Sequence, residues 1–289
     1  MPQSPAPPQV LARRPRTAPT GILQIVHLYA TEHTWEVAPG TVVHGYGYNA
    51  QVPGPTLEAA VGDTLLVRFT NSLPEPTSIC WPGLLTPPSG RAGVVRASTP
   101  VPQGGTLEHR LELPHAGTFA YHPDIDYTRQ TERGLYGALV VRDPAEPVLD
   151  GERVLIIGDL RSTPPDGHAA SAPEKSDGRH EGLLLVNGVQ EAQMLVTAGH
   201  RERWRLVNAT VARRLRLSLS GQPVTVTSTG RGLLAAPIAV NELWLGPGER
   251  RDLVAGPFTA GQSLTFDALP DDNGSGTSLS GRLATLHVA

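Results

Sequence analysis

The residue types in this sequence best suited to chemistry are a single cysteine and a short run that joins a histidine to two carboxylates. The cysteine is Cys80, and the run holds His122, Asp124 and Asp126 at every second position. Side chains two residues apart on a strand point to the same face. A thiolate, an imidazole and a carboxylate are acceptable zinc ligands, so a fold that brings Cys80 to His122 and Asp124 would create a small metal site. The alternative is structural: a cysteine packed as a small apolar residue, a hydrogen-bonded histidine and a solvated aspartate.

Several other kinds of chemistry are excluded. With one cysteine there is no internal disulfide and no multi-cysteine metal motif. Met194 is the only methionine besides Met1, which excludes a methionine cluster for copper trafficking. We find no nucleophile elbow, phosphate-binding loop or dinucleotide fingerprint. The formal net charge is -3, so nothing favours binding to nucleic acid or to an anionic membrane.

The sequence carries no recognisable membrane or export signal. No stretch reaches the roughly 18 uninterrupted apolar residues that a membrane span requires. The first twenty residues are rich in proline, alanine and arginine, and they lack the apolar centre of a signal peptide. Taken as it stands, the sequence predicts a cytoplasmic protein, or one whose export signal is absent from this chain.

Short β-strands are predicted throughout, because 31 glycines and 28 prolines accompany many brief apolar runs. Between Leu107 and Leu113 apolar and polar residues alternate, so the odd positions face inward. His109 is therefore predicted to be a core histidine with a hydrogen-bond partner. Leu65, Val67 and Phe69 form a similar inward row, and further runs lie at 154–157, 215–219, 224–226, 243–245 and 283–288. These features predict an all-β chain that folds as sandwiches or barrels.

The chain also repeats a pattern of turn, strand start and strand end. In the first half Asn49-Ala50-Gln51 is followed by Gly62-Asp63-Thr64 and then by Arg68-Phe69-Thr70-Asn71. In the second half Asn187-Gly188-Val189 is followed by Gly199-His200-Arg201 and then by Arg205-Leu206-Val207-Asn208. The nearly equal spacing predicts a duplicated β domain.

A polar, proline-rich connection at residues 143–147 marks the expected domain boundary. It divides the chain into a flexible N-terminal segment (1–20), a first domain (21–146) and a second domain (147–289). Residues 162–181 are expected to form an exposed loop within the second domain. The arginines of the second domain, at positions 201, 203, 205, 213, 214 and 216, alternate with apolar residues and are predicted to lie on solvated strand faces.

Longer stretches resemble the multicopper oxidase (laccase-like) family. YNAQVPGPTLEAAVGDTLLVRFTNSLPEPTSICWPG (48–83) and GTFAYHPDIDYTRQTERGLYGALVVRDP (117–144) resemble its first domain. LLLVNG (183–188), RWRLVNATVARRLRLSLSG (203–221) and LGPGERRDLV (245–254) resemble its middle domain. The resemblance covers about residues 20 to 289 and implies two cupredoxin-like Greek-key β-barrels. It also implies a periplasmic or secreted location.

The same resemblance implies four copper ions: one blue copper that accepts electrons and three clustered coppers that reduce oxygen. In the first domain the family holds the cluster with His-Trp-His-Gly and Tyr-His-x-His. Here the first motif reads Cys80-Trp81-Pro82-Gly83 and the second reads Tyr121-His122-Pro123-Asp124, so one histidine of four is retained. The family's blue-copper Cys-His motif lies in a third domain, and the sequence predicts that this chain ends with the middle domain.

Three hypotheses follow from these departures. The first is a copper-free binding or scaffold protein that acts through protein contacts and has no oxidase activity, with copper implied only by the family. The second is a copper-dependent oxidoreductase completed by another chain. The third is a small metal-binding protein that uses Cys80, His122 and Asp124.

A docking surface is expected where the family's third domain would cover the first. Apolar residues near the altered motifs, namely Trp81, Leu84 and Leu85, are the candidates for an exposed interface. We expect this face to be covered by a second copy of the chain, by another protein, or by the proline-rich segment 86–105. Self-association is the simplest of these, because most oligomers are symmetric homo-oligomers.

Overall fold

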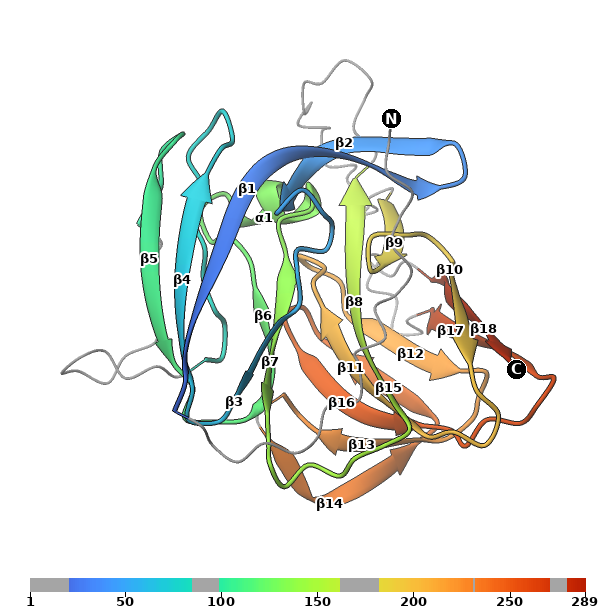
Figure 1. Ribbon diagram of the computed structural model, residues 1–289. Helices are drawn as coiled ribbons and strands as arrows, with labels where there is room; N and C mark the ends of the chain where they lie inside the picture. Colours follow the sequence, from blue (N-terminus) through green and yellow to red (C-terminus); the bar gives the residue numbers. More distant parts are fainter. Residues whose placement is uncertain (1–20, 85–98, 162–181, 231, 271–279) are drawn as a thin grey trace.

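The computed structural model describes residues 21–84, 99–161, 182–230, 232–270 and 280–289. Four β-sheets form two cupredoxin-like domains, with one short helix in the described part of the chain (Figure 1). This confirms the predicted all-β fold. The predictions for the N-terminal segment (1–20), for the loop 162–181, for Leu85 and for residues 86–98 fall outside the described residues.

The first half of the chain forms two sheets. The four-stranded sheet has the order β2 (Thr41–Tyr48), β1 (Leu23–Ala38), β4 (Thr64–Asn71) and β5 (Thr106–Glu112). The three-stranded sheet has the order β3 (Leu57–Ala60), β7 (Gly137–Arg142) and β6 (Gly117–Tyr121), and helix α1 (Tyr127–Glu132) lies between β6 and β7 in the sequence. The predicted inward row on β4 is confirmed, because Leu65, Val67 and Phe69 are fully buried.

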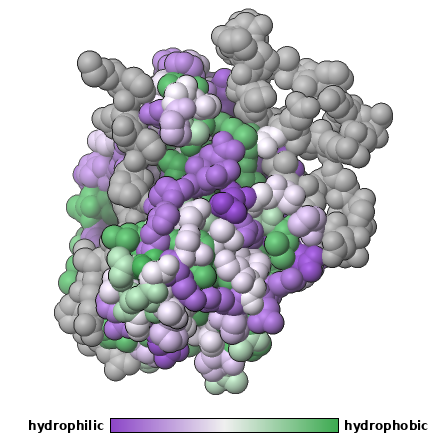
Figure 2. All heavy atoms as spheres, turned by 90° about the vertical axis from the view of Figure 1, so that its right-hand side faces the viewer, coloured by the Kyte–Doolittle hydropathy of each residue, from purple (hydrophilic) through white to green (hydrophobic). Residues whose placement is uncertain are grey.

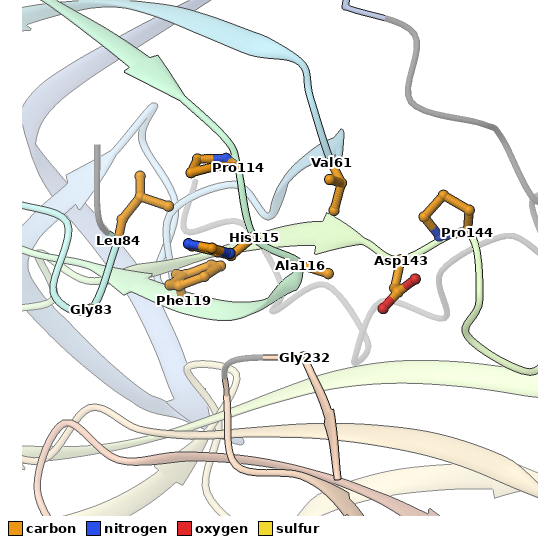
Figure 3. A pocket seen from close by; sticks show the side chains of 10 residues that line it. All are labelled: Val61, Gly83, Leu84, Pro114, His115, Ala116, Phe119, Asp143, Pro144 and Gly232. Carbon is orange, nitrogen blue, oxygen red and sulfur yellow. The ribbon is translucent and has the colours of Figure 1, made fainter. Parts of the chain in front are cut away.

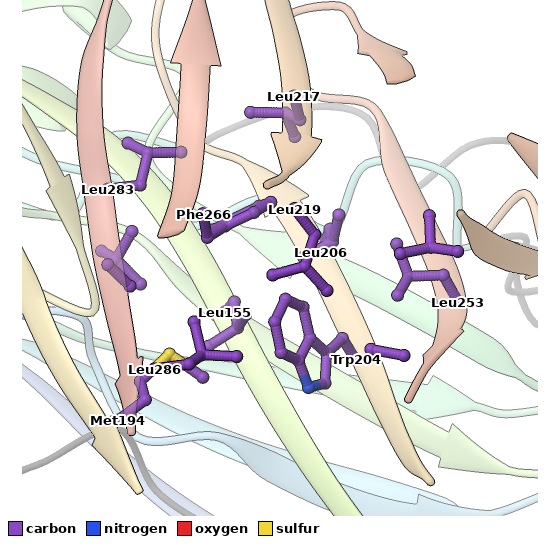
Figure 4. Close-up of a cluster of buried hydrophobic side chains, with 14 of the residues drawn as sticks. Leu155, Met194, Trp204, Leu206, Leu217, Leu219, Leu253, Phe266, Leu283 and Leu286 are labelled. Carbon is purple, nitrogen blue, oxygen red and sulfur yellow. The ribbon is translucent and has the colours of Figure 1, made fainter. Parts of the chain in front are cut away.

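The second half forms a larger sandwich. Its six-stranded sheet has the order β14 (Leu233–Val240), β13 (Val224–Ser228), β16 (Arg250–Ala255), β11 (Glu202–Asn208), β8 (Gly151–Arg161) and β9 (Gly182–Val186). Its five-stranded sheet has the order β10 (Ala192–Val196), β18 (Gly281–Val288), β17 (Ser263–Leu269), β12 (Leu215–Leu219) and β15 (Glu242–Leu245). Apolar side chains fill the space between them, with the Trp204 and Phe266 rings edge to face at 5.5 Å (Figure 4). All five runs predicted as strands in this half lie within strands.

The asparagine that ends each repeated strand makes the same contacts in both halves. Asn71 donates from its side-chain amide to the carbonyls of Glu75 and Val101, and its oxygen accepts from the Leu73 amide. Asn208 likewise bonds two carbonyls and the amide two residues further on. The repeated sequence pattern therefore corresponds to a repeated fold, because each asparagine satisfies backbone groups that the strand ladder leaves open.

The turn asparagines repeat as well. Asn49 and Asn187 both adopt a positive φ, of 55° and 50°. Asn49 accepts from the Tyr29 amide and donates to the His27 carbonyl of β1. Asn187 makes the equivalent pair of bonds to β8. Asparagine tolerates the left-handed conformation and can bond locally, which suits it to this position.

The two halves share an extensive buried contact. The β6–β7 side of the first half packs on β8 and β11 through Tyr136, Val140 and neighbouring apolar residues. The long β1–β2 hairpin reaches the second half, where Trp35 donates from Nε1 to the Gly188 carbonyl at 3.1 Å and the Gln190 amide donates to Val37 at 2.8 Å. Because the β6–β7 side of the first half covers one face of β11, this strand is buried along its whole length.

The face of the second half that carries β10, β17 and β18 mixes hydrophilic and hydrophobic residues (Figure 2). Leu195 on β10 is its most exposed large apolar side chain among the described residues, at 66%. In the described part of the chain there is no helix of the length and apolarity needed to cross a membrane.

Candidate functional site

The two altered motifs of the first domain lie side by side. Cys80 and His122 form an isolated antiparallel bridge in which each backbone amide donates to the other's carbonyl, at 2.8 and 3.3 Å. The Cys80 Sγ atom lies 3.4 Å from His122 Nδ1. The predicted proximity of this thiol and this imidazole is therefore present. We call Cys80, His122 and Asp124 the motif cluster.

The His122 ring is held by its own backbone and by a neighbouring aromatic ring. Its Nδ1 lies 2.7 Å from the Pro123 carbonyl oxygen, and because a carbonyl can only accept, this nitrogen carries the proton. The ring lies against Tyr127, with centroids 4.7 Å apart. Burial lowers the pKa of His122 below its ordinary value of 6.5, and this outweighs the opposing effects of the Pro123 carbonyl and Asp124.

The Asp124 carboxylate is directed to a local turn. Its Oδ1 accepts from the Ser78 hydroxyl at 3.1 Å. The Ser78 oxygen in turn accepts from the backbone amides of Asp124 and Ile125, both at 3.1 Å. This exchange fixes the loop after β6 against the strand bridge and directs the carboxylate to Ser78.

The Cys80 thiol is half-buried and protonated at neutral pH. Burial, with a smaller contribution from the Asp124 charge, raises its pKa to about 12, although a backbone hydrogen bond at His122 acts in the opposite direction. The thiolate is the nucleophile and the metal ligand, so a raised pKa disfavours both roles. The side chain is half-buried, where the structural alternative was a cysteine packed as a small apolar residue.

The predicted exposure of Trp81 and Leu84 is wrong. Their exposed fractions are 1% and 2%, and both belong to the core of the first domain. Trp81 donates from Nε1 to His109 Nδ1 at 3.3 Å, and its ring lies 5.3 Å from that of Tyr121. The reason is that β5 and β6 supply an acceptor and an aromatic wall that the local sequence does not reveal. His109, by contrast, is a half-buried core histidine with a hydrogen-bond partner, as predicted.

Two family profiles, both described as multicopper oxidase, match residues 29–146 and 151–259. The chain belongs to the multicopper oxidase family. Multicopper oxidase MmcO of Mycobacterium tuberculosis is 29% identical over 74% of this chain and 48% of its own length. Cell division protein FtsP of Escherichia coli is 32% identical over 76% of this chain and 48% of its own length. The chain thus spans about half the length of the curated relatives it matches.

Solved structures agree with this assignment. The multicopper oxidase of Pseudomonas thermotolerans superposes with a TM-score of 0.77 at 29% identity, over 92% of this chain and 64% of that one. The multicopper oxidase of Campylobacter jejuni gives a TM-score of 0.76 at 27% identity, over 99% of this chain and 62% of the other.

In this chain, the residues at the two first-domain motifs do not fit a copper site. Pro82 has no side-chain donor, the Cys80 thiol is protonated, and Asp124 is directed to Ser78. Across the described ranges, no three or more His, Cys, Asp and Glu side chains form a group that could hold a metal ion. The three-ligand metal site proposed for Cys80, His122 and Asp124 is therefore not formed in this arrangement, since a pair of neighbours is not a convergent set of ligands.

The most densely charged buried region was missed by the sequence analysis. It lies where the first half meets β11, and we call it the arginine cluster: Arg142, Arg203, Arg205, Glu146, Glu152 and Asp252. Arg205 is 1% exposed. It donates to Glu152 at 2.6 Å, to Glu146 at 2.6 Å and to Asp252 at 2.8 Å. Arg203 is also buried, with its Nε 3.2 Å from Glu146 and its Nη2 donating to the Pro147 carbonyl at 2.9 Å.

The prediction of solvated arginine faces is wrong for Arg203, Arg205 and Arg213, all at most 5% exposed. Alternation along β11 separates two faces, but both are covered, one by the core of the second half and the other by the first half. The signal in the sequence that could have predicted these ion pairs was the set of acidic residues near the domain connection. Glu146 lies within the domain connection and Glu152 follows it, so they could have been paired with the arginines of the later strand β11.

Electrostatics in the arginine cluster favour the ionised forms of Arg205 and Glu152, whereas burial lowers the pKa of Arg203. Burial alone would lower the pKa of Arg205, but the charges of Asp252, Glu146 and Glu152 raise it. Burial would also raise the pKa of Glu152, but Arg205 and Arg142 lower it. Thr118 of β6 completes the contact by donating to Asp252 at 2.7 Å. The cluster thus joins the two domains through paired charges.

Proposed function

We propose that this region of the chain is a copper-free multicopper-oxidase-like module that acts through protein contacts and not through oxidation. The observation that carries the proposal is the state of the first-domain motifs. Of four family histidine positions only His122 is retained, and the others hold Cys80, with a protonated thiol, Pro82, with no side-chain donor, and Asp124. A copper cluster would therefore lack three of the four histidines that this domain supplies in the family.

The comparisons include relatives named for two different roles. The Escherichia coli relative is named for cell division, and the Mycobacterium tuberculosis relative is named as an oxidase. The family therefore includes proteins named for either role, and our proposal that this chain does not act by oxidation is supported by its altered motifs. Fold alone does not decide function, since the function lies in the site.

Copper content of the purified full chain tests the proposal. The protein would be loaded with copper, dialysed, and measured by elemental analysis together with its absorbance and its oxidation of a phenol. We expect substoichiometric copper, no thiolate-to-copper absorption band and no phenol oxidation. Tightly held stoichiometric copper would overturn the proposal and favour an oxidoreductase completed by another chain.

A matched variant sharpens the test. The triple change Cys80→His, Pro82→His and Asp124→His returns the family residues to these positions. We expect increased copper retention with no oxidase turnover, because electrons still lack an entry site. Turnover by this variant would show that an electron entry site exists elsewhere in the chain.

The protein contacts in this proposal are with a second copy of the chain or with another protein. Since Trp81 and Leu84 are buried, a docking surface must use other residues. Light scattering coupled to size exclusion distinguishes the two partners, because a homo-oligomer has a multiple of the 30.7 kDa chain mass. A monomer that also recovers no specific partner in cross-linking would contradict the contact role.

A further inference from the structure

We propose that a cavity beside the domain connection binds a small organic cation with an apolar body. The cavity has a volume of about 510 Å³ and is lined by loops of the first half, by the connection at Asp143 and Pro144, and by Gly232 of the second half (Figure 3). This volume lies in the range of small-molecule sites. The cavity does not include the motif cluster, so this inference goes beyond the proposed function and is independent of it.

The walls of the cavity are mostly apolar and firmly held. Leu84 and Phe119 are 2% and 1% exposed and form the base of the cavity, with Phe119 held in β6 and Leu84 in the turn after Trp81. Val61 and Ala116 add further apolar surface. A ligand with an aromatic or aliphatic body would therefore gain by leaving water for this surface, at about 25 cal/mol for each Å² of apolar area buried.

One negative charge faces this apolar cavity with spare bonding capacity. Asp143 uses Oδ1 to accept from the Ala145 amide at 2.7 Å. Among the described residues nothing donates to its Oδ2. The carboxylate is thus oriented by its own turn and keeps one oxygen for a ligand.

His115 is a second polar group of the cavity without a partner among the described residues. Its neutral imidazole can accept one ligand N–H and donate to a ligand oxygen. The Arg250 side chain lies behind Gly83, where it donates to the Thr118 and Gly248 carbonyls.

The Asp143 carboxylate favours a positively charged ligand. An ammonium group would form a charge-assisted hydrogen bond with Asp143 Oδ2. A neutral ligand of the same shape would gain only the apolar contact, and an anion would meet a carboxylate of the same sign. The geometry therefore favours a cation such as an arylalkylamine.

The test compares two probes that share a phenylethyl body and differ in the terminal group, the cationic 2-phenylethylamine and the neutral 2-phenylethanol. Binding to the full chain would be measured by titration with nuclear magnetic resonance detection. We expect the amine to bind at least about five-fold more tightly than the alcohol. Amide shifts should centre on residues 61, 84, 115–119, 143–144 and 232. Equal affinity for the two probes, or shifts centred elsewhere, would overturn the proposal.

The variant Asp143→Asn isolates the charge. Asparagine keeps the side-chain oxygen that accepts from the Ala145 amide, so the turn is retained while the charge is removed. We expect the preference for the amine to disappear. Glu112→Gln removes an exposed charge on β5 and should leave the preference unchanged. An undiminished preference in Asp143→Asn would contradict the proposal, and a preference lost equally in both variants would show a non-specific charge effect and contradict it too.

Discussion

The motif cluster and the arginine cluster are both polar groups inside an apolar fold, yet their physical states differ. In the motif cluster His122 bonds its neighbour's carbonyl, Asp124 bonds Ser78, and the Cys80 thiol is neutral. In the arginine cluster the charges remain and are paired across the junction of the two halves, with Arg205 1% exposed. Among the described residues, the first region has no convergent set of metal ligands, and the second has a dense set of ion pairs between the two halves.

The comparison shows that a departure from a family motif and a large contribution to stability are different properties of a cluster. The motif cluster was conspicuous in the sequence because it departs from a family pattern. The arginine cluster was inconspicuous because arginine and glutamate are common on surfaces. Buried charges cost several kcal/mol each to desolvate, so a paired buried cluster is where single substitutions should have the largest effects.

Breaking the arginine cluster should give the largest change. Arg205→Met removes the guanidinium that bonds three carboxylates and keeps most of the side-chain volume. We expect the free energy of unfolding to fall by about 3–5 kcal/mol. Urea unfolding followed by tryptophan fluorescence measures this.

An exposed ion pair provides the matched control for Arg205→Met. Arg68 bonds Glu108 at 2.7 Å, but both side chains are about half exposed, at 44% and 52%. Arg68→Met should therefore change the free energy of unfolding by less than about 1 kcal/mol. Equal losses in the two variants would show that burial of Arg205 carries no special energetic weight.

The two clusters should also respond to acid in different pH ranges. The folded pKa of His122 is lowered, so the unfolded chain binds its proton first, and stability falls as the pH drops below about 6.5. The folded pKa of Glu152 is lowered too, so its contribution is present above about 4.5 and is lost as the pH falls below that value.

His122→Phe should therefore flatten the decline in unfolding free energy between pH 7.5 and 5.5, and leave the loss below pH 4.5 in place. Urea unfolding at a series of pH values measures both ranges. His27→Gln replaces an exposed histidine on β1 and is the matched control. An unchanged slope in His122→Phe would show that this ring is not the group that titrates there.

The smallest effect is expected at Cys80. Cys80→Ala removes one half-buried sulfur atom, which should cost about 1 kcal/mol or less. A thiol reagent should label the native protein far more slowly than the unfolded chain. The pKa of about 12, against an ordinary 9.0, lowers the thiolate fraction about a thousandfold. Labelling at the unfolded rate would contradict the raised pKa, and labelling slowed by zinc would favour a metal site.

Much of this architecture was determined by the sequence alone. Alternation placed Leu65, Val67 and Phe69 in the core, and repeated asparagines predicted two related domains whose backbone contacts then proved to match. The altered motifs also identified Cys80 and His122 as neighbours. These are local properties: side-chain period, turn chemistry and residue type act over a few positions and can be read from the chain.

What lies against each face was decided only by the tertiary structure. Alternation on β11 assigned the arginines to one face but could not show that a second domain covers it. Trp81 was predicted to be exposed because the family's third domain would cover that face, but its partners, His109 and Tyr121, come from strands 28 and more residues away and bury it. The cavity at Asp143 likewise depends on loops from both halves. Burial, and with it the energy of every charge and ring, is a property of packing between distant segments, which the sequence does not specify locally.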